Sequence, residues 1–80
     1  MTIPKDWKIE GKYVKTYHCV DHTIEVTITE VNDERYVYRC YEDNMGICFS
    51  TTMTLKEAFE ESDAYIKDVY GDVFFRNGGL

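Results

Sequence analysis

Features typical of membrane, exported and nucleic-acid-binding proteins are scarce in this chain of 80 residues. Its longest uninterrupted apolar runs are two or three residues, whereas a membrane helix needs about 20 and a signal peptide needs a shorter apolar core. Lys and Arg number nine against 15 Asp and Glu, which gives a net charge of −6. That balance disfavours phosphate-backbone binding, because such affinity comes largely from basic residues. We therefore expect no membrane segment and no direct contact with nucleic acid.

Disulfides and the common catalytic motifs are also not indicated. The three cysteines, Cys19, Cys40 and Cys48, are an odd number, whereas small disulfide-stapled domains usually carry four, six or eight. Reduced thiols and a cytoplasmic location are the expectation. The five glycines form no phosphate-binding loop, and H-E-x-x-H, C-x-x-C and G-x-S-x-G motifs do not occur. We expect neither an enzyme nor a cofactor.

What the chain does contain predicts one small folded domain over residues 1–80. Apolar residues make up 44% and aromatic residues 15% of the chain, too many for intrinsic disorder. Residues 1–11, with the only proline, predict an extended lead-in, and residues 77–80 a flexible tail. Alternation of apolar and polar residues from 23 to 31 predicts a strand with one buried face.

The remaining pattern predicts an antiparallel sheet followed by a helix. Thr54 and Glu57 fit a capping box at a helix start, apolar residues recur at helical spacing as far as Tyr70, and Gly71 is a natural helix stop. The fold class predicted is α+β, an antiparallel β-meander of three to four strands with one amphipathic helix packed on one face. The segments are a sheet over residues 12–52, with strands at 12–20, 23–31, 35–42 and 47–52, a helix over 54–70 and a short edge strand at 72–76.

Strand register around the turn at Asn32 is left open by the sequence. A three-residue loop places Val26 opposite Cys40, and all three cysteines then share one end of one sheet face. A two-residue loop places Val26 opposite Arg39 and turns Cys40 away from Cys19. A slip of one residue moves every side chain to the other face.

The metal-ligating residue types are Cys19, His22, Cys40 and Cys48. Thiolate and imidazole groups suit zinc, but structural zinc sites usually take ligands in close pairs, and seven residues separate Cys40 from Cys48. Free cysteine is commonly buried, so buried thiols without a ligand are favoured over a zinc site. A Cys–His nucleophile is disfavoured because the neighbours His18 and Cys19 point to opposite sides of a strand.

Carboxylates gather on the predicted helix. Outward-facing carboxylates stay ionised, whereas a general acid needs a raised pKa and therefore burial. They serve either solubility or docking of a basic partner. The acidic face is predicted from Glu57, Glu60, Glu61, Asp63 and Asp68.

Tyrosine is abundant, with seven in the chain. The strand at 35–42 has large residues on both faces, so some must lie on the face without a helix. Tyr and Arg dominate interface hot spots, which predicts a protein-binding surface. The alternatives are cross-strand pairs that only stabilise the sheet and RNA stacking, which the net charge disfavours. The predicted surface comprises Arg35, Tyr36, Tyr38 and Arg39.

Residues 46–70, GICFSTTMTLKEAFEESDAYIKDVY, resemble the strand-to-helix segment of HicB-type antitoxin domains. Those domains run through a G-C-F-like strand into T-L-x-E-A and an amphipathic helix. Here Ile47 stands between Gly46 and Cys48, and Met53 replaces the acidic residue usual before Thr54. The resemblance implies an antitoxin module that neutralises a small toxin and is usually dimeric.

The overall plan is also similar to that of small phage anti-CRISPR and anti-defence proteins. That likeness rests on size, acidity and the combination of a sheet with a helix, and it implies an inhibitor that occupies a partner's surface. The function predicted is therefore a non-enzymatic acidic protein that occludes a basic surface of a partner protein or nucleoprotein complex. A HicB-like antitoxin and a small zinc-binding domain are the alternatives, and a homodimer is plausible because the sheet has exposed edges.

Overall fold

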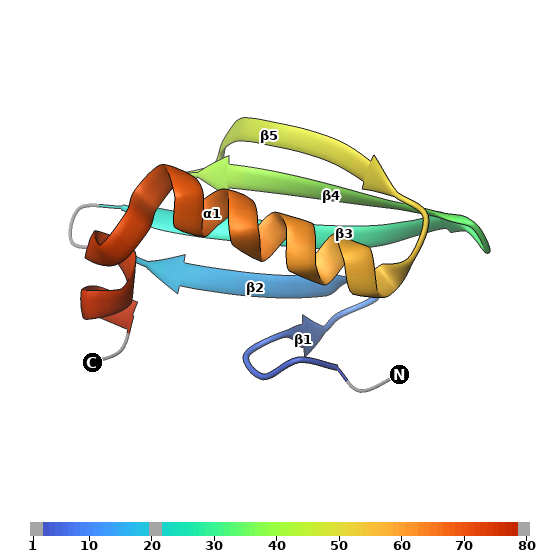
Figure 1. Cartoon of the computed structure of the whole chain (residues 1–80), viewed down its shortest axis with the longest axis horizontal. Coiled ribbons are helices and arrows are strands. Elements are labelled where there is room, and N and C mark those ends of the chain that lie inside the picture. Colours follow the sequence, from blue (N-terminus) through green and yellow to red (C-terminus); the bar gives the residue numbers. More distant parts are fainter. Residues whose placement is uncertain (1–2, 20–21, 79–80) are drawn as a thin grey trace.

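A computed structural model describes residues 3–19 and 22–78 of the chain, with residues 72–78 described by their backbone alone. The strands are β1 (Lys8–Ile9), β2 (Tyr13–His18), β3 (Thr23–Asn32), β4 (Arg35–Glu42) and β5 (Met45–Thr52). They form one sheet in the order β1-β2-β3-β4-β5, and every neighbouring pair is antiparallel. The helix α1 (Leu55–Gly78) lies across one face of this sheet (Figure 1). The predicted α+β meander is confirmed, with five strands instead of three to four because β1 adds a two-residue strand at one edge.

The register around the Asn32 turn is the first of the two alternatives. Val26 pairs with Cys40 and Ile24 with Glu42. A bulge between Glu30 and Asn32 shifts the pairing there. Such an extra residue lets the turn close without moving the alternation of the strand beyond it. The apolar face of β3 therefore stays toward the helix.

The core lies between this sheet face and α1. Ile24, Val26 and Ile28 on β3 are completely buried, and burial of each such side chain contributes about 1.5–3 kcal/mol. They pack in one cluster with Ala58, Phe59 and Ile66 of the helix and with Tyr17, Tyr38 and Cys40 of the neighbouring strands. Ser62 is also buried, and its hydroxyl donates to the carbonyl oxygen of Ala58 at 2.7 Å, so no polar group of this side chain is left unsatisfied.

The start of α1 is the predicted capping box. The Glu57 N–H donates to the Thr54 hydroxyl at 3.1 Å. In return, the Thr54 N–H donates to Glu57 Oε1, also at 3.1 Å. Two backbone donors that a helix start would otherwise leave without partners are thereby satisfied.

The end of α1 differs from the sequence prediction. Gly71 has φ 58° and ψ −146°, so the regular helix is interrupted where a stop was predicted. The edge strand predicted at 72–76 is wrong, because residues 72–78 are helical. An edge strand must lie beside an existing strand, whereas the chain turns beyond the end of the sheet after Gly71 (Figure 1). There the segment has no strand beside it, and helical hydrogen bonds let its own N–H and C=O groups pair with one another. The tail predicted at 77–80 lies partly outside the described residues.

Candidate functional site

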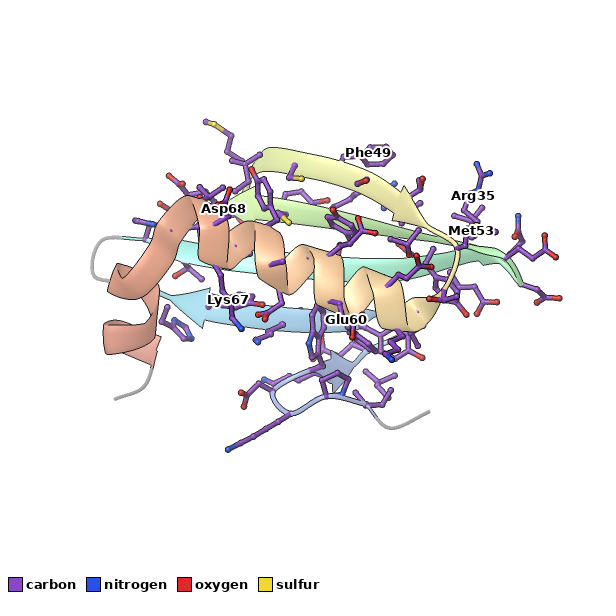
Figure 2. The ribbon with its side chains drawn as sticks, in the orientation of Figure 1. Arg35, Phe49, Met53, Glu60, Lys67 and Asp68 are labelled. Atoms are coloured by element: carbon purple, nitrogen blue, oxygen red, sulfur yellow. The ribbon has the colours of Figure 1, made fainter. Side chains whose placement is uncertain are left out.

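One row of exposed acids runs along the side of α1 that faces β5. Glu57, Glu61 and Asp68 are separated by four and seven residues, the spacing that aligns side chains along a helix, and all three are exposed. The Tyr38 hydroxyl donates to Glu61 Oε1 at 3.5 Å, and Figure 2 places Asp68 on this same side. We call these three residues the acidic row. None of them forms an ion pair with any described residue.

Glu60 and Lys67 lie on the opposite side of α1, toward β2 (Figure 2). Both are exposed. Lys67 Nζ is 2.8 Å from Asp63 Oδ2 in an i, i+4 ion pair. The negative charge of this side is therefore partly offset, whereas that of the acidic row is not.

Asp63 is not the outward-facing carboxylate that helical spacing predicted. It is half-buried and accepts a hydrogen bond from the Tyr17 hydroxyl at 2.9 Å, while Lys15 lies 3.5 Å from it. Burial by itself would raise the pKa of Asp63, but the hydrogen bonds from Lys67 and Tyr17 and the charge of Lys15 outweigh it and lower the pKa. Burial, followed by the Asp63 hydrogen bond, raises the pKa of Tyr17. Asp63 therefore joins α1 to β2 instead of facing a partner.

The four residues predicted as a binding surface on β4 lie on two different faces. Tyr36 and Tyr38 face the helix, where Tyr38 is buried in the core and Tyr36 packs against it. Arg35 and Arg39 have the opposite parity on the strand, so they point to the uncovered face, and both are exposed. The prediction of one surface from these four residues is wrong, because side chains alternate along a strand.

The aromatic group on the uncovered face comes from residues that the sequence reasoning did not select. Phe49 pairs with Arg39 across β4 and β5, and the guanidinium carbon of Arg39 lies 5.3 Å from the Phe49 ring centroid. Arg39 also donates to the Thr29 hydroxyl at 3.4 Å. A depression beside this pair includes Tyr41 and Gly46 in its lining. The alternation of β5 carried the signal for Phe49, since Cys48 and Phe49 must face opposite sides.

The outer edge of β5 presents apolar residues and no charge. Phe49 is 63% exposed, Met45 is 71% exposed, and Met53, just past the strand, is 70% exposed. No residue of Met45–Thr52 is charged. We call the side of β5 that is not paired with β4 the β5 edge. The sequence signal for this edge was the uncharged run of β5, which by itself predicts only a strand.

The cysteines do not assemble a metal site. Cys40 and Cys48 lie opposite each other on β4 and β5, and all three cysteines, including Cys19, are free thiols. Burial raises the pKa of Cys40 to about 12 and also raises the pKa of Cys19, with Glu42 and Asp43 adding to the effect. Both thiols therefore stay protonated near neutral pH, which disfavours thiolate chemistry. Among the described residues, no group of three or more Cys, His, Asp or Glu side chains could hold a metal ion.

His22 lies directly before β3. The Cys19 N–H donates to the His22 carbonyl oxygen at 2.9 Å, and the imidazole packs on Tyr70 with ring centroids 5.5 Å apart. Its Nε2 atom is buried without a hydrogen-bond partner in the described part of the chain. The contacts of His22 are therefore those of a side chain packed against α1.

Comparison with known proteins adds no relative. No protein family, no curated protein and no solved structure matches this chain. Within the described residues, no helix combines the length and apolar character needed to cross a bilayer.

Proposed function

We propose that this protein is a non-enzymatic binding protein that occludes a basic surface of a partner protein or nucleoprotein complex. The observation that supports it is the acidic row, whose carboxylates are exposed and make no ion pair with a described residue. A cluster of like charges on one side of a small protein steers a basic partner toward that side and excludes acidic ones. The uneven distribution of charge along the chain agrees with this, since residues 41–80 contain eight acids and three bases.

The class of partner proposed follows from the two resemblances. An inhibitor of the anti-CRISPR or anti-defence kind would cover a nucleic-acid groove, which is basic because it neutralises phosphates. A HicB-like module would instead cover a small toxin. Both require the same acidic surface, so the charge of that surface is what an experiment should change first.

The test is to reverse the two acids of the acidic row that take no part in the capping box. In the variant Glu61→Lys, Asp68→Lys, Glu57 keeps its hydrogen bonds with Thr54. The matched control reverses two exposed acids of β3, Glu25→Lys and Glu30→Lys, which changes the net charge equally. Each protein is immobilised and used to capture partners from a lysate of the source cells.

We expect the wild type and the control to capture the same basic proteins. The helix variant should capture at least tenfold less of them. Circular dichroism should show that all three proteins are folded. Equal capture by the helix variant and the control would contradict the acidic-row proposal. A captured small basic toxin would assign the antitoxin function, and a captured nuclease complex would assign the anti-defence function.

A further inference from the structure

The β5 edge is an open edge of the sheet. Within the described residues β5 pairs only with β4, and the sheet order places it at one end. Figure 1 shows nothing lying beyond it on that side. An edge strand carries a row of backbone N–H and C=O groups without sheet partners, and these can pair with another strand.

Natural proteins usually protect such an edge, and this one has little protection. The common devices are charged side chains, proline, bulges and very short strands. β5 has eight residues with neither charge nor proline, and its one irregularity is a bulge opposite the Cys40–Tyr41 step. The stretch Cys48–Thr52 beyond the bulge is regular. The opposite edge, β1, is by contrast only two residues long.

The charges beside the β5 edge differ between the two faces of the sheet. The acidic row lies on the helix-covered face, on the side of α1 that faces β5. On the uncovered face, Arg39 is exposed and stacks on Phe49. A sixth strand would lie about 4.8 Å outside β5. Lys or Arg side chains on its helix side could reach toward the acidic row, whereas basic side chains on its other side would face Arg39.

A second copy of this chain fits the edge poorly. Antiparallel pairing of β5 with β5 about a two-fold axis places both helices on the same face of the joined sheet. The two acidic rows would then face each other across the axis, and each copy carries a net charge of −6. Like charges in close apposition disfavour such an interface. A basic strand from another protein has no such penalty.

We propose that the β5 edge binds an extended segment of a basic partner protein, which adds to the sheet as a sixth strand. The segment carries Lys or Arg at alternate positions, which face the acidic row, and apolar residues between them, which pack toward Phe49. This inference rests on the proposed function and names the form in which the partner is recognised. Main-chain hydrogen bonds provide affinity in such strand addition, and the alternating side chains provide specificity.

The test uses three synthetic peptides of ten residues and the full ¹⁵N-labelled protein. In the first peptide Lys alternates with Thr or Val, in the second Glu replaces each Lys, and in the third two central Thr or Val residues of the first are replaced by proline. Proline cannot donate a ladder hydrogen bond, so the third peptide keeps the charge and loses the ability to pair. Amide shifts and amide hydrogen exchange are recorded for each titration.

We expect the Lys peptide to shift and protect amides of residues 48–52. The Glu and proline peptides should bind at least tenfold more weakly at these amides. The variant Phe49→Lys, which adds a charge to the exposed edge, should lower the affinity for the Lys peptide at least fivefold. Thr16→Lys, on the uncovered face of β2, serves as the matched control and should leave binding unchanged.

Three results would overturn this proposal. If the Lys and proline peptides shift only the α1 amides equally, the acidic row binds basic chains and strand addition is wrong. If no basic peptide binds at millimolar concentration, strand addition is wrong, and the capture experiment with the helix variant still decides the proposed function. If the β5 amides shift with protein concentration alone and sedimentation shows a dimer, the edge is occupied by a second copy.

Discussion

At the scale of single residues, burial decides which charged groups are free to bind a partner. Asp63 and Asp68 are both helix carboxylates, five residues apart, yet Asp63 accepts the Tyr17 hydroxyl and pairs with two lysines whereas Asp68 is exposed without an ion pair to a described residue. The difference arises because Tyr17 and Lys15 on β2 lie under one side of α1 only. A partner can therefore use the charge of Asp68 without first breaking contacts within the fold.

Asp63 is expected to make stability depend on pH in the acid range. Its pKa is lowered in the folded state, so its contribution is present above the unfolded pKa and is lost as the pH falls through the folded pKa. Asp63→Asn should cost about 1.5–3 kcal/mol at pH 7, the range for a hydrogen bond to a charged group. Urea unfolding of both proteins between pH 7 and pH 2 measures this difference.

The difference between wild type and Asp63→Asn should shrink toward zero below the folded pKa, because the protonated acid then resembles the amide. The control Asp68→Asn, at an exposed position, should change stability by less than about 0.5 kcal/mol at every pH. A constant penalty for Asp63→Asn across the whole range would mean that the charge of Asp63 does not stabilise the fold.

At the scale of elements, local hydrogen bonds set where α1 begins, and alternation sets which residues share a sheet face. The capping box needs only two residues that are three apart in the chain, and so the helix start was predictable. Tyr36 and Tyr38 lie on the other face of the sheet from Arg35 and Arg39 because side chains alternate along a strand. A candidate surface on a strand therefore has to be chosen from every second residue.

Removing the helix cap should destabilise the whole domain measurably. Thr54→Ala deletes the hydroxyl that accepts the Glu57 N–H, and such a loss costs about 1 kcal/mol. Chemical denaturation followed by circular dichroism gives the value. Thr51→Ala, at an exposed position of β5, is the matched control and should cost less; equal losses would argue against the capping role of Thr54.

At the scale of the whole molecule, one thin core supports both the acidic row and the β5 edge. The main cluster of buried residues lies on one face of the sheet, and α1 is the one helix described that covers this face (Figure 1). A domain of 80 residues has a free energy of unfolding of about 4–12 kcal/mol at typical stability per residue. Loss of one large core side chain is therefore a considerable fraction of the total.

Ile66→Ala should show this dependence. Ile66 is completely buried where α1 meets the sheet, and truncation of such a side chain typically costs 2–5 kcal/mol. We expect a large fall in the midpoint of thermal unfolding. Val69→Ala, at a position 51% exposed on the same helix, should change the midpoint little. If the two variants unfold together with the wild type, the packing of α1 on the sheet described here is incorrect.

The sequence by itself determined the elements whose signals are local. The alternation of Ile24, Val26 and Ile28, the capping box of Thr54 and Glu57, and the break at Gly71 each depend on neighbours within a few residues. Together with the helical apolar pattern, they were sufficient to predict the α+β meander.

Only the tertiary structure decided the register, the burial of Asp63 and the open β5 edge. Register depends on a bulge between Glu30 and Asn32, which no local sequence signal predicted. The environment of Asp63 depends on Tyr17, 46 residues away in the chain. The edge position of β5 depends on which strands lie beside it. These are properties of long-range packing, and a candidate binding surface consists of the residues that such packing leaves exposed.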